Sequence, residues 1–288
     1  MNLSTTAWIL TLPRELTLML KSRLHQIQVS LPLLLMLLPC AVIAQPDSSP
    51  AADDLLRAVS QRLWGVDQVS TIIVTERDHS DSTRTRRFRL HVHYPQPADS
   101  ILKQTCMEVV APDKLTGQKY WLWVMSDQRE RTWIYMPRID KLREIQRRPG
   151  NRHRSQEIDL GELNITAEQI KSHTHQILDS PLLNDHQVIQ VKSIEKDAGP
   201  RRQERHPDYK LLWIDPEALL VRQAEIYSGR DKLMKRYTVQ ATKSVGGYTV
   251  ATGILIWDAQ RKKETTITVD DLNLEPVHEP LLFQPTSD

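Results

Sequence analysis

Apolar and polar residues alternate along most of the chain from residue 69 onward, which is the side-chain period of a β-strand. Short segments rich in Gly, Pro, Asp and Ser interrupt this alternation repeatedly. The pattern therefore predicts a mainly β protein of roughly ten or eleven antiparallel strands joined by short turns. Its clearest strands span residues 69–76, 85–94, 101–110, 209–214 and 248–258.

A helical period precedes the first strand. Over residues 53–64, apolar side chains recur at helical spacing, namely Leu55, Leu56, Val59 and Leu63. Asp53 or Asp54 can cap this helix, and residues 164–169 can start a short second one. A large antiparallel sheet twists and curls, and a helix can fill its concave side. We therefore expect a large curved antiparallel sheet, a half-barrel, with one or two helices covering the concave side.

The densest aromatic segment is a predicted hairpin over residues 120–136, which holds three of the seven tryptophans. Trp121 and Trp123 share one face of its first strand, and Trp133 and Tyr135 share one face of its second. Both faces of the hairpin are apolar. One face should therefore pack against a core, and the other needs a cover, a partner or a ligand.

Tryptophan outnumbers phenylalanine by seven to two, and it favours sites where its N–H finds a polar partner. We therefore expect aromatic side chains on neighbouring strands to line the mouth of a ligand cavity. The candidate cavity residues are Trp121, Trp123, Trp133, Tyr135, Trp213 and Trp257. The alternative, in which these rings fill the core, stays open.

A basic segment follows the hairpin and offers a candidate surface for docking a partner or an anionic headgroup. The candidate docking residues are Arg138, Lys141, Arg143, Arg147 and Arg148. Residues 147–157 include Pro-Gly-Asn and are otherwise polar or charged, which predicts an exposed loop. A solvated loop that only keeps the protein soluble is the open alternative.

The first 44 residues predict an export signal. A basic start that includes Lys21 and Arg23 precedes an apolar run over residues 31–42, and Ala44 ends a cleavage site. The run is too short for a confident transmembrane helix, which needs about 20 apolar residues. An uncleaved membrane anchor is the alternative, and translation can start at Met1 or Met19.

Beyond this signal, residues 45–52 are expected to form a polar linker and residues 53–288 a single domain. Basic and acidic residues balance, with a formal net charge of +2 for the whole chain, so no nucleic-acid partner is expected. Cys106 is the one cysteine after the signal, so no internal disulfide is expected. Its position in an apolar strand predicts a buried side chain.

The sequence contains no GxSxG, Walker loop or HExxH motif, and we expect neither enzyme activity nor a bound metal or cofactor. Two His-x-His pairs, His91/His93 and His173/His175, could begin a metal site. Because no cysteine or carboxylate cluster supplies further ligands, the pattern favours a solvated outer strand face. An arginine run could contact anionic headgroups or simply line a wet strand face: Arg84, Arg86, Arg87 and Arg89.

Two neighbouring segments, LTGQKYWLWV and TWIYMPRIDKLREI, resemble the outer-membrane lipoprotein-sorting-like family of bacterial periplasmic proteins. The positions that match the family pattern are Trp133, Tyr135, Pro137, Lys141, Arg143 and Ile145. Three later segments follow in the family's order, YKLLWIDPEALLVRQAEIYSGRDKLMKRYTV, GYTVATGILIWD and KKETTITVDDLNL, so the resemblance spans about residues 55–283. The chain departs from the family at RHRSQEIDLGEL, where Ser155 lacks the usual Gly and Asp, and this puts the family's mode of docking in question.

The resemblance implies a LolA-type fold, a half-barrel whose helix-covered apolar cavity shields acyl chains in the periplasm, and an association with RND-superfamily exporters. From it we expect a periplasmic carrier or adaptor that binds a lipid, or the acyl chains of a lipoprotein, and exchanges it with an RND-type inner-membrane transporter. The alternative is an envelope-stress sensor that binds lipid or protein and signals to an inner-membrane regulator. The ligand and the direction of transfer are not set by these residues.

Overall fold

The computed structural model describes residues 50–96, 100–127, 129–145, 163, 165–196 and 208–286, all within one compact unit, Pro46–Asp288. The predicted export signal lies outside the described residues, and so do Arg147 and Arg148 of the predicted docking surface. Within the described ranges, no helix has both the length and the apolar character needed to cross a membrane.

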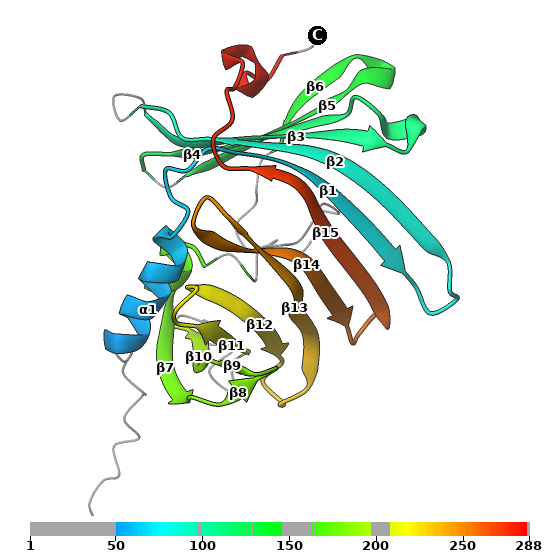
Figure 1. Cartoon of the computed structure of the whole chain (residues 1–288). Helices are drawn as coiled ribbons and strands as arrows, with labels where there is room; N and C mark the ends of the chain where they lie inside the picture. Colours follow the sequence, from blue (N-terminus) through cyan, green and yellow to red (C-terminus); the bar gives the residue numbers. More distant parts are fainter. Residues whose placement is uncertain are drawn as a thin grey trace, which may run out of the picture. The chain divides into compact units, whose positions relative to one another are not determined.

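Thirteen strands form one antiparallel sheet with β6 and β7 at its edges (Figure 1). The first six strands follow one another as a meander: β1 (Gln68–Arg77), β2 (Thr83–His93), β3 (Ile101–Ala111), β4 (Lys119–Met125), β5 (Glu130–Met136) and β6 (Lys141–Ile145). The other seven form a second meander: β7 (His173–Asp179), β10 (Ile189–Glu195), β11 (Tyr209–Asp215), β12 (Leu220–Tyr227), β13 (Leu233–Val245), β14 (Tyr248–Asp258) and β15 (Lys263–Asn273). Pairing of β15 with β1 joins the two meanders into a single sheet.

The expected large curved antiparallel sheet is confirmed, and it has more strands than the alternation predicted. Strand β6 lies within the segment that we expected to be a basic surface, and β8 (Leu182–Leu183) and β9 (His186–Gln187) form a separate small hairpin. The predicted turn between β13 and β14 is present. Gly246 and Gly247 in this turn both have positive φ angles, 56° and 82°. Such angles suit the tight turn of a hairpin and favour glycine.

In the part of the chain that the structure describes, two helices accompany the sheet. Helix α1 spans Pro50–Gln61, so residues 50–52, which we expected in the linker, are helical. A proline is well tolerated in the first turn of a helix, where its missing N–H has no partner to lose. Helix α2 spans Ala167–Ser172 and begins with a capping box in which Thr166 and Gln169 bond each other's backbone N–H groups. Three short 3₁₀ turns complete the described elements: η2 (Asp113–Leu115), η3 (Pro137–Ile139) and η4 (Pro280–Phe283).

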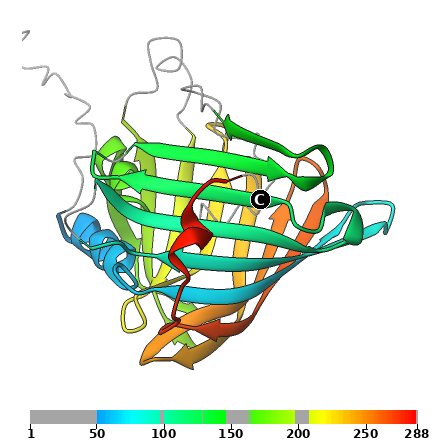
Figure 2. The ribbon, with the colours of Figure 1, turned by 90° about the horizontal axis from the view of Figure 1, so that it is seen from above.

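The main core lies on the inner face of the curled sheet. Phe88 on β2 and Leu212 on β11, far apart in strand order, belong to one cluster of buried side chains. Leu56 and Val59 of α1 belong to the same cluster, so the helix packs against this inner face. Figure 2 shows α1 at one end of the curved sheet. The expected covering of the concave side by helices is therefore confirmed.

Candidate functional site

The tryptophan hairpin, β4 and β5, has its aromatic face on the outside of the sheet. Trp121 and Trp133 are direct cross-strand neighbours, and Cys106 on β3 lies beside Trp121. These three side chains and Tyr135 form a second core cluster together with Phe283, which comes from the far end of the chain. The prediction that Cys106 is buried is confirmed, since its exposed fraction is 0%.

The cover of this outer face is the C-terminal strap, which we define as residues 275–286 and which includes η4. Figure 2 shows the strap lying across the strands on the outside of the curve. The indole N–H of Trp121 donates a hydrogen bond to the carbonyl of Leu282 at 2.9 Å, and that of Trp123 donates to the carbonyl of Phe283 at 3.0 Å. The hairpin's second apolar face is thus covered by the chain itself.

Trp213 and Trp257 lie away from the hairpin. On their strands, Leu212 and Ile256 point into the main core, so the two tryptophans, which alternate with them, point outward. Trp257 is 38% exposed. Strands β11 and β14 are separated from each other by two strands and from β4 by several more. The structure therefore does not bring the six aromatic residues together in one cavity, and Trp121, Trp133 and Tyr135 are core residues.

The inner face of β3–β6 instead presents apolar side chains that neither cluster of buried residues contains. Across the strands, Met107, Tyr120 and Ile134 are successive neighbours in one row. Leu122 occupies the next row. Met107 and Tyr120 contact the margin of the main core, whereas Leu122 and Ile134 belong to neither cluster and are half-buried. We define these four residues as the inner apolar surface.

Basic side chains stand where the inner apolar surface reaches the sheet edge. Arg143 on β6 is the direct neighbour of Ile134, and Lys141 is the neighbour of Met136, so both lie at inner-face positions. Both are exposed, as is Arg138 in η3. Within the described part of the chain, these three cations have no hydrogen bond or ion pair. Three of the five predicted docking residues are therefore close together in the chain and exposed.

A lysine marks the opposite end of the inner apolar surface. Lys103 on β3 is the neighbour of Val124 on β4, and its amine lies 5.9 Å from the centroid of the Tyr94 ring. Burial lowers the pKa of Lys103, and the nearby Glu130 carboxylate opposes this effect. A buried cation that is costly to keep charged is stabilised by an anionic partner.

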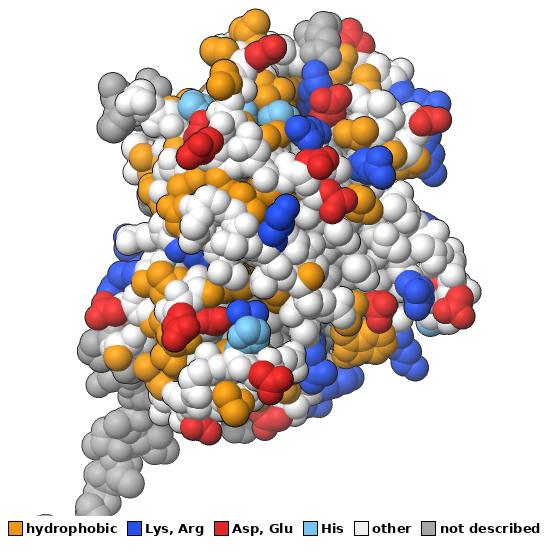
Figure 3. Space-filling model, viewed as in Figure 1, with side chains coloured by type: hydrophobic (Ala, Val, Ile, Leu, Met, Phe, Trp, Pro, Cys, Tyr) orange, Lys and Arg blue, Asp and Glu red, His pale blue; other side chains and the backbone are white. Residues whose placement is uncertain are grey.

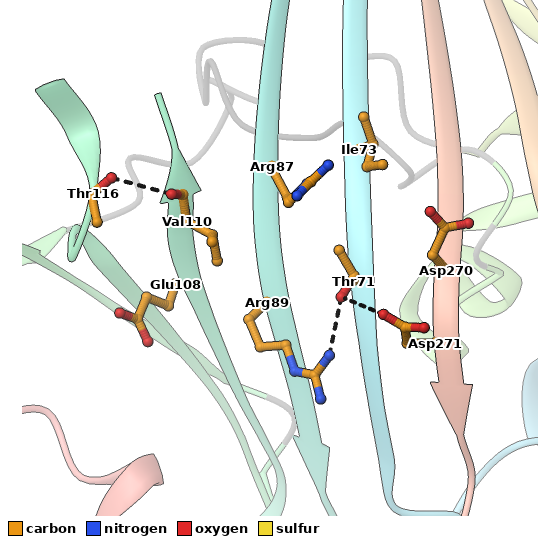
Figure 4. A pocket seen from close by; sticks show the side chains of 9 residues that line it. All are labelled: Thr71, Ile73, Arg87, Arg89, Glu108, Val110, Thr116, Asp270 and Asp271. Atoms are coloured by element: carbon orange, nitrogen blue, oxygen red, sulfur yellow. Dashed lines mark hydrogen bonds between the residues drawn. The ribbon is translucent and has the colours of Figure 1, made fainter. Parts of the chain in front are cut away.

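A shallow groove of about 540 Å³ lies on the outer face of β1–β3 and β15 (Figure 4). Arg87 and Arg89 from β2 face Asp270 and Asp271 across it. The guanidinium of Arg89 donates to the hydroxyl of Thr71 at 3.0 Å. Because charges of both signs line the groove, it does not select a simple anion.

The arginine run divides between the two faces of β2. Arg86 pairs with Glu76 at 3.5 Å at an inner-face position, whereas Arg87 and Arg89 lie on the outer face. These arginines therefore do not form one continuous basic patch. They fit the alternative in which they line ordinary strand faces.

The expectation of a solvated strand face is wrong for His173 and His175, whereas His91 and His93 are half-buried on the outer face of β2. His173 and His175 are 6% and 3% exposed and have stacked rings 6.2 Å apart. Burial, together with the positive charge of Lys210, lowers the pKa of His173 to about 4. His91 and His93 lie beside the C-terminal strap, where His93 stacks on Phe283. Among the residues that the structure describes, no cluster of His, Cys, Asp or Glu is arranged to hold a metal ion.

Sequence reasoning missed the strap and the inner apolar surface. The strap begins about 140 residues after the hairpin that it covers, and no local pattern links the two. The inner surface carries a weak signal, since Tyr120, Leu122 and Ile134 are the residues that alternate with the tryptophans. The sequence-based prediction instead selected the tryptophans, which lie on the opposite face of the hairpin.

The architecture places the protein among LolA-type half-barrels. A DUF1329 family protein from Desulfovibrio piger has the same fold, with a TM-score of 0.68 and 16% identity over 83% of this chain and 98% of that chain. A protein from Vibrio parahaemolyticus, described as an outer membrane lipoprotein-sorting protein domain, has a TM-score of 0.63 and 17% identity over 81% and 96% of the two chains. For a LolA superfamily protein from Nitrosomonas europaea, the TM-score is 0.55 and the identity 15%, over 81% and 97%.

The sequence model of one family, described as "Uncharacterized protein", matches residues 102–287, which is more than half of the chain. The chain therefore belongs to this family, the DUF1329-like family. No curated protein sequence matches the chain. The similarity to LolA-type proteins that the hairpin motifs suggested is confirmed at the level of fold.

Proposed function

We propose that this protein is an exported carrier that holds the acyl chain of a lipid or lipoprotein on its inner apolar surface and exchanges it with a membrane partner. The observation that carries this proposal is the row of Met107, Tyr120 and Ile134, which continues to Arg143 at the sheet edge. An apolar row that ends in an exposed cation matches an amphiphile with an anionic head. The LolA-type fold supports the same ligand class, because one protein of this fold is described as a lipoprotein-sorting domain.

The free energy of acyl-chain burial is large enough for such a role. Each buried CH₂ group contributes about 0.8 kcal/mol, so a 16-carbon chain contributes roughly 12 kcal/mol before its ordering cost. A chain bound this firmly leaves slowly on its own. Release would then need a partner, and the resemblance in sequence favours a transporter of the RND type. Arg138, Lys141 and Arg143 are the described residues that we propose meet the anionic head or this partner, with Arg147 and Arg148 following in the sequence.

Palmitate binding tests the apolar part of the proposal, measured by displacement of a fluorescent fatty acid from the purified protein. Leu122→Glu places a carboxylate on the inner apolar surface and should weaken binding at least about tenfold, which corresponds to about 1.4 kcal/mol. Leu255→Glu is the matched control, because Leu255 is half-buried on the outer face of β14. An inability of the unaltered protein to bind palmitate, or equal losses in the two variants, would argue against the proposal.

The basic edge can be tested in the same assay. The double variant Lys141→Glu, Arg143→Glu should weaken palmitate binding while leaving the affinity for uncharged methyl palmitate unchanged. The double variant Arg261→Glu, Lys262→Glu controls for total charge, since both residues are exposed in the turn after β14. If both ligands weaken equally, or if the control behaves like the first double variant, Lys141 and Arg143 do not recognise the head.

A further inference from the structure

The C-terminal strap is held above a group of histidines as well as above tryptophans. His278, which is part of the strap, has a side chain only 5% exposed, and its Nε2 lies 3.1 Å from the carbonyl oxygen of Val92. Its ring packs at right angles against Phe283, with 5.1 Å between centroids. Figure 3 shows histidine side chains close to the C-terminal segment at the top of the view. The strap and the histidines under it are therefore packed as one unit.

Among the histidines under the strap, His91 has the surroundings that least favour a charged ring. Its Nδ1 atom is buried without a hydrogen-bond partner in the described part of the chain. Its ring lies 5.5 Å from that of His278 and is a cross-strand neighbour of Cys106. A neutral imidazole tolerates this position, whereas an imidazolium has two N–H groups to satisfy and a charge to solvate. Protonation of His91 therefore opposes the closed position of the strap.

We infer that the strap is a pH-sensitive cover, which protonation of His91 releases from the outer face of the tryptophan hairpin in mild acid. Opening removes Phe283 from its cluster and exposes Cys106, Trp121 and Trp133. It also separates His278 from His91 and admits water to both rings. This inference concerns the outer face of the sheet, and it does not depend on the acyl-carrier proposal.

The charges around His91 favour opening in acid. His278 from the strap and Arg89 from β2 both lower the pKa of His91, and burial has the largest effect, bringing the pKa to about 4. Asp67, which precedes β1, contacts His93 at 2.7 Å and lies 4.0 Å from His278, so it is paired with other rings. Burial raises the pKa of Cys106 to about 12, so this thiol stays neutral throughout.

The size of the pH effect follows from the difference between the pKa of His91 in the closed state and its pKa in the open state. A histidine whose pKa is depressed when buried stabilises the closed state above its ordinary pKa and loses this contribution as pH falls toward the depressed value. The pKa of His91 is lowered to about 4 in the closed state and is about 6.5 for a solvated ring. The ratio of open to closed strap therefore rises about 30-fold between pH 7.5 and pH 5. The working window is therefore pH 6.5 to 4.

Cys106 provides a natural reporter, because it is fully buried beneath the strap. In the full chain with Cys40→Ser, Cys106 is the one thiol, and 4,4′-dithiodipyridine labels thiols in acid as well as at neutral pH. Its labelling rate, divided at each pH by that of the urea-unfolded chain, follows the open fraction of the strap when closing is fast. We expect this ratio to rise about 30-fold from pH 7.5 to pH 5.

Two variants separate strap release from general unfolding in acid. His91→Phe keeps an aromatic ring and removes the titrating group, so its labelling ratio should stay flat between pH 7.5 and pH 5. If it does not fold, His91→Asn is the substitute. His79→Asn, an exposed histidine in the turn after β1, should respond like the unaltered chain. A flat ratio in the unaltered chain, or an equal rise in the folded His91 variant, would overturn the inference.

Discussion

Phe283→Ala tests whether the strap is part of the folded core. Phe283 is 2% exposed and belongs to the cluster that contains Trp121, Trp133 and Cys106. It also stacks on His93 with 5.3 Å between ring centroids. The substitution removes the side chain by which η4 enters the cluster, so it weakens the attachment of the whole strap.

The expected loss of stability in Phe283→Ala follows from the burial of the Phe283 side chain. Truncation of a buried phenylalanine to alanine costs about 3–5 kcal/mol when the surroundings stay in place. The strap can instead detach, which limits the loss to the free energy that holds the strap on the sheet. We therefore expect the free energy of unfolding to fall by about 3 kcal/mol.

Urea unfolding followed by circular dichroism measures this change through the shift of the midpoint at constant slope. Leu281→Ala is a matched control two residues away, because Leu281 is 72% exposed, and it should change the stability by less than about 0.5 kcal/mol. If Phe283→Ala is as stable as the control, the strap is not a structural cover and our reasoning about the outer cluster fails.

Two further predictions concern single groups. Trp121→Phe removes the N–H that bonds the Leu282 carbonyl and should cost about 1–3 kcal/mol in urea unfolding. Trp257→Phe, at a site 38% exposed, should cost less than about 0.5 kcal/mol, and equal costs would contradict the assigned bond. Burial lowers the pKa of His173 to about 4, so its contribution to stability is lost as pH falls from 6.5 to 4. His173→Asn should flatten this acid dependence of urea unfolding by up to about 3 kcal/mol, and an unchanged dependence would contradict the assignment.

Strand patterns were predictable from the sequence because alternation along a strand reports which side chains face the core. Phe88 on β2 and Leu212 on β11 are examples, since each alternates with polar or outward-facing neighbours and each is buried. The need for a second cover over the tryptophan hairpin also followed from alternation. Strand β6 was missed because its five residues carry mostly charged side chains, as suits an edge strand.

The identity of the covers could not be predicted from local patterns. His173 and His175 look solvated in the sequence, yet the adjoining α2 and other elements bury them. His91 is likewise next to the strap, which begins more than 180 residues later in the chain. Burial of a polar side chain depends on which distant segment packs over it, and alternation along one strand contains no information about that segment.

Photo-labelling with a diazirine analogue of palmitate tests the central claim most directly, because it reports where on the protein the acyl chain lies. Irradiation of the complex and peptide mapping should place the label on the inner apolar surface, at Met107, Tyr120, Leu122 or Ile134. Unlabelled palmitate should compete for these sites. Competed labelling confined to the outer face, on the strap or around Trp213 and Trp257, would contradict the account, and so would the absence of competed labelling.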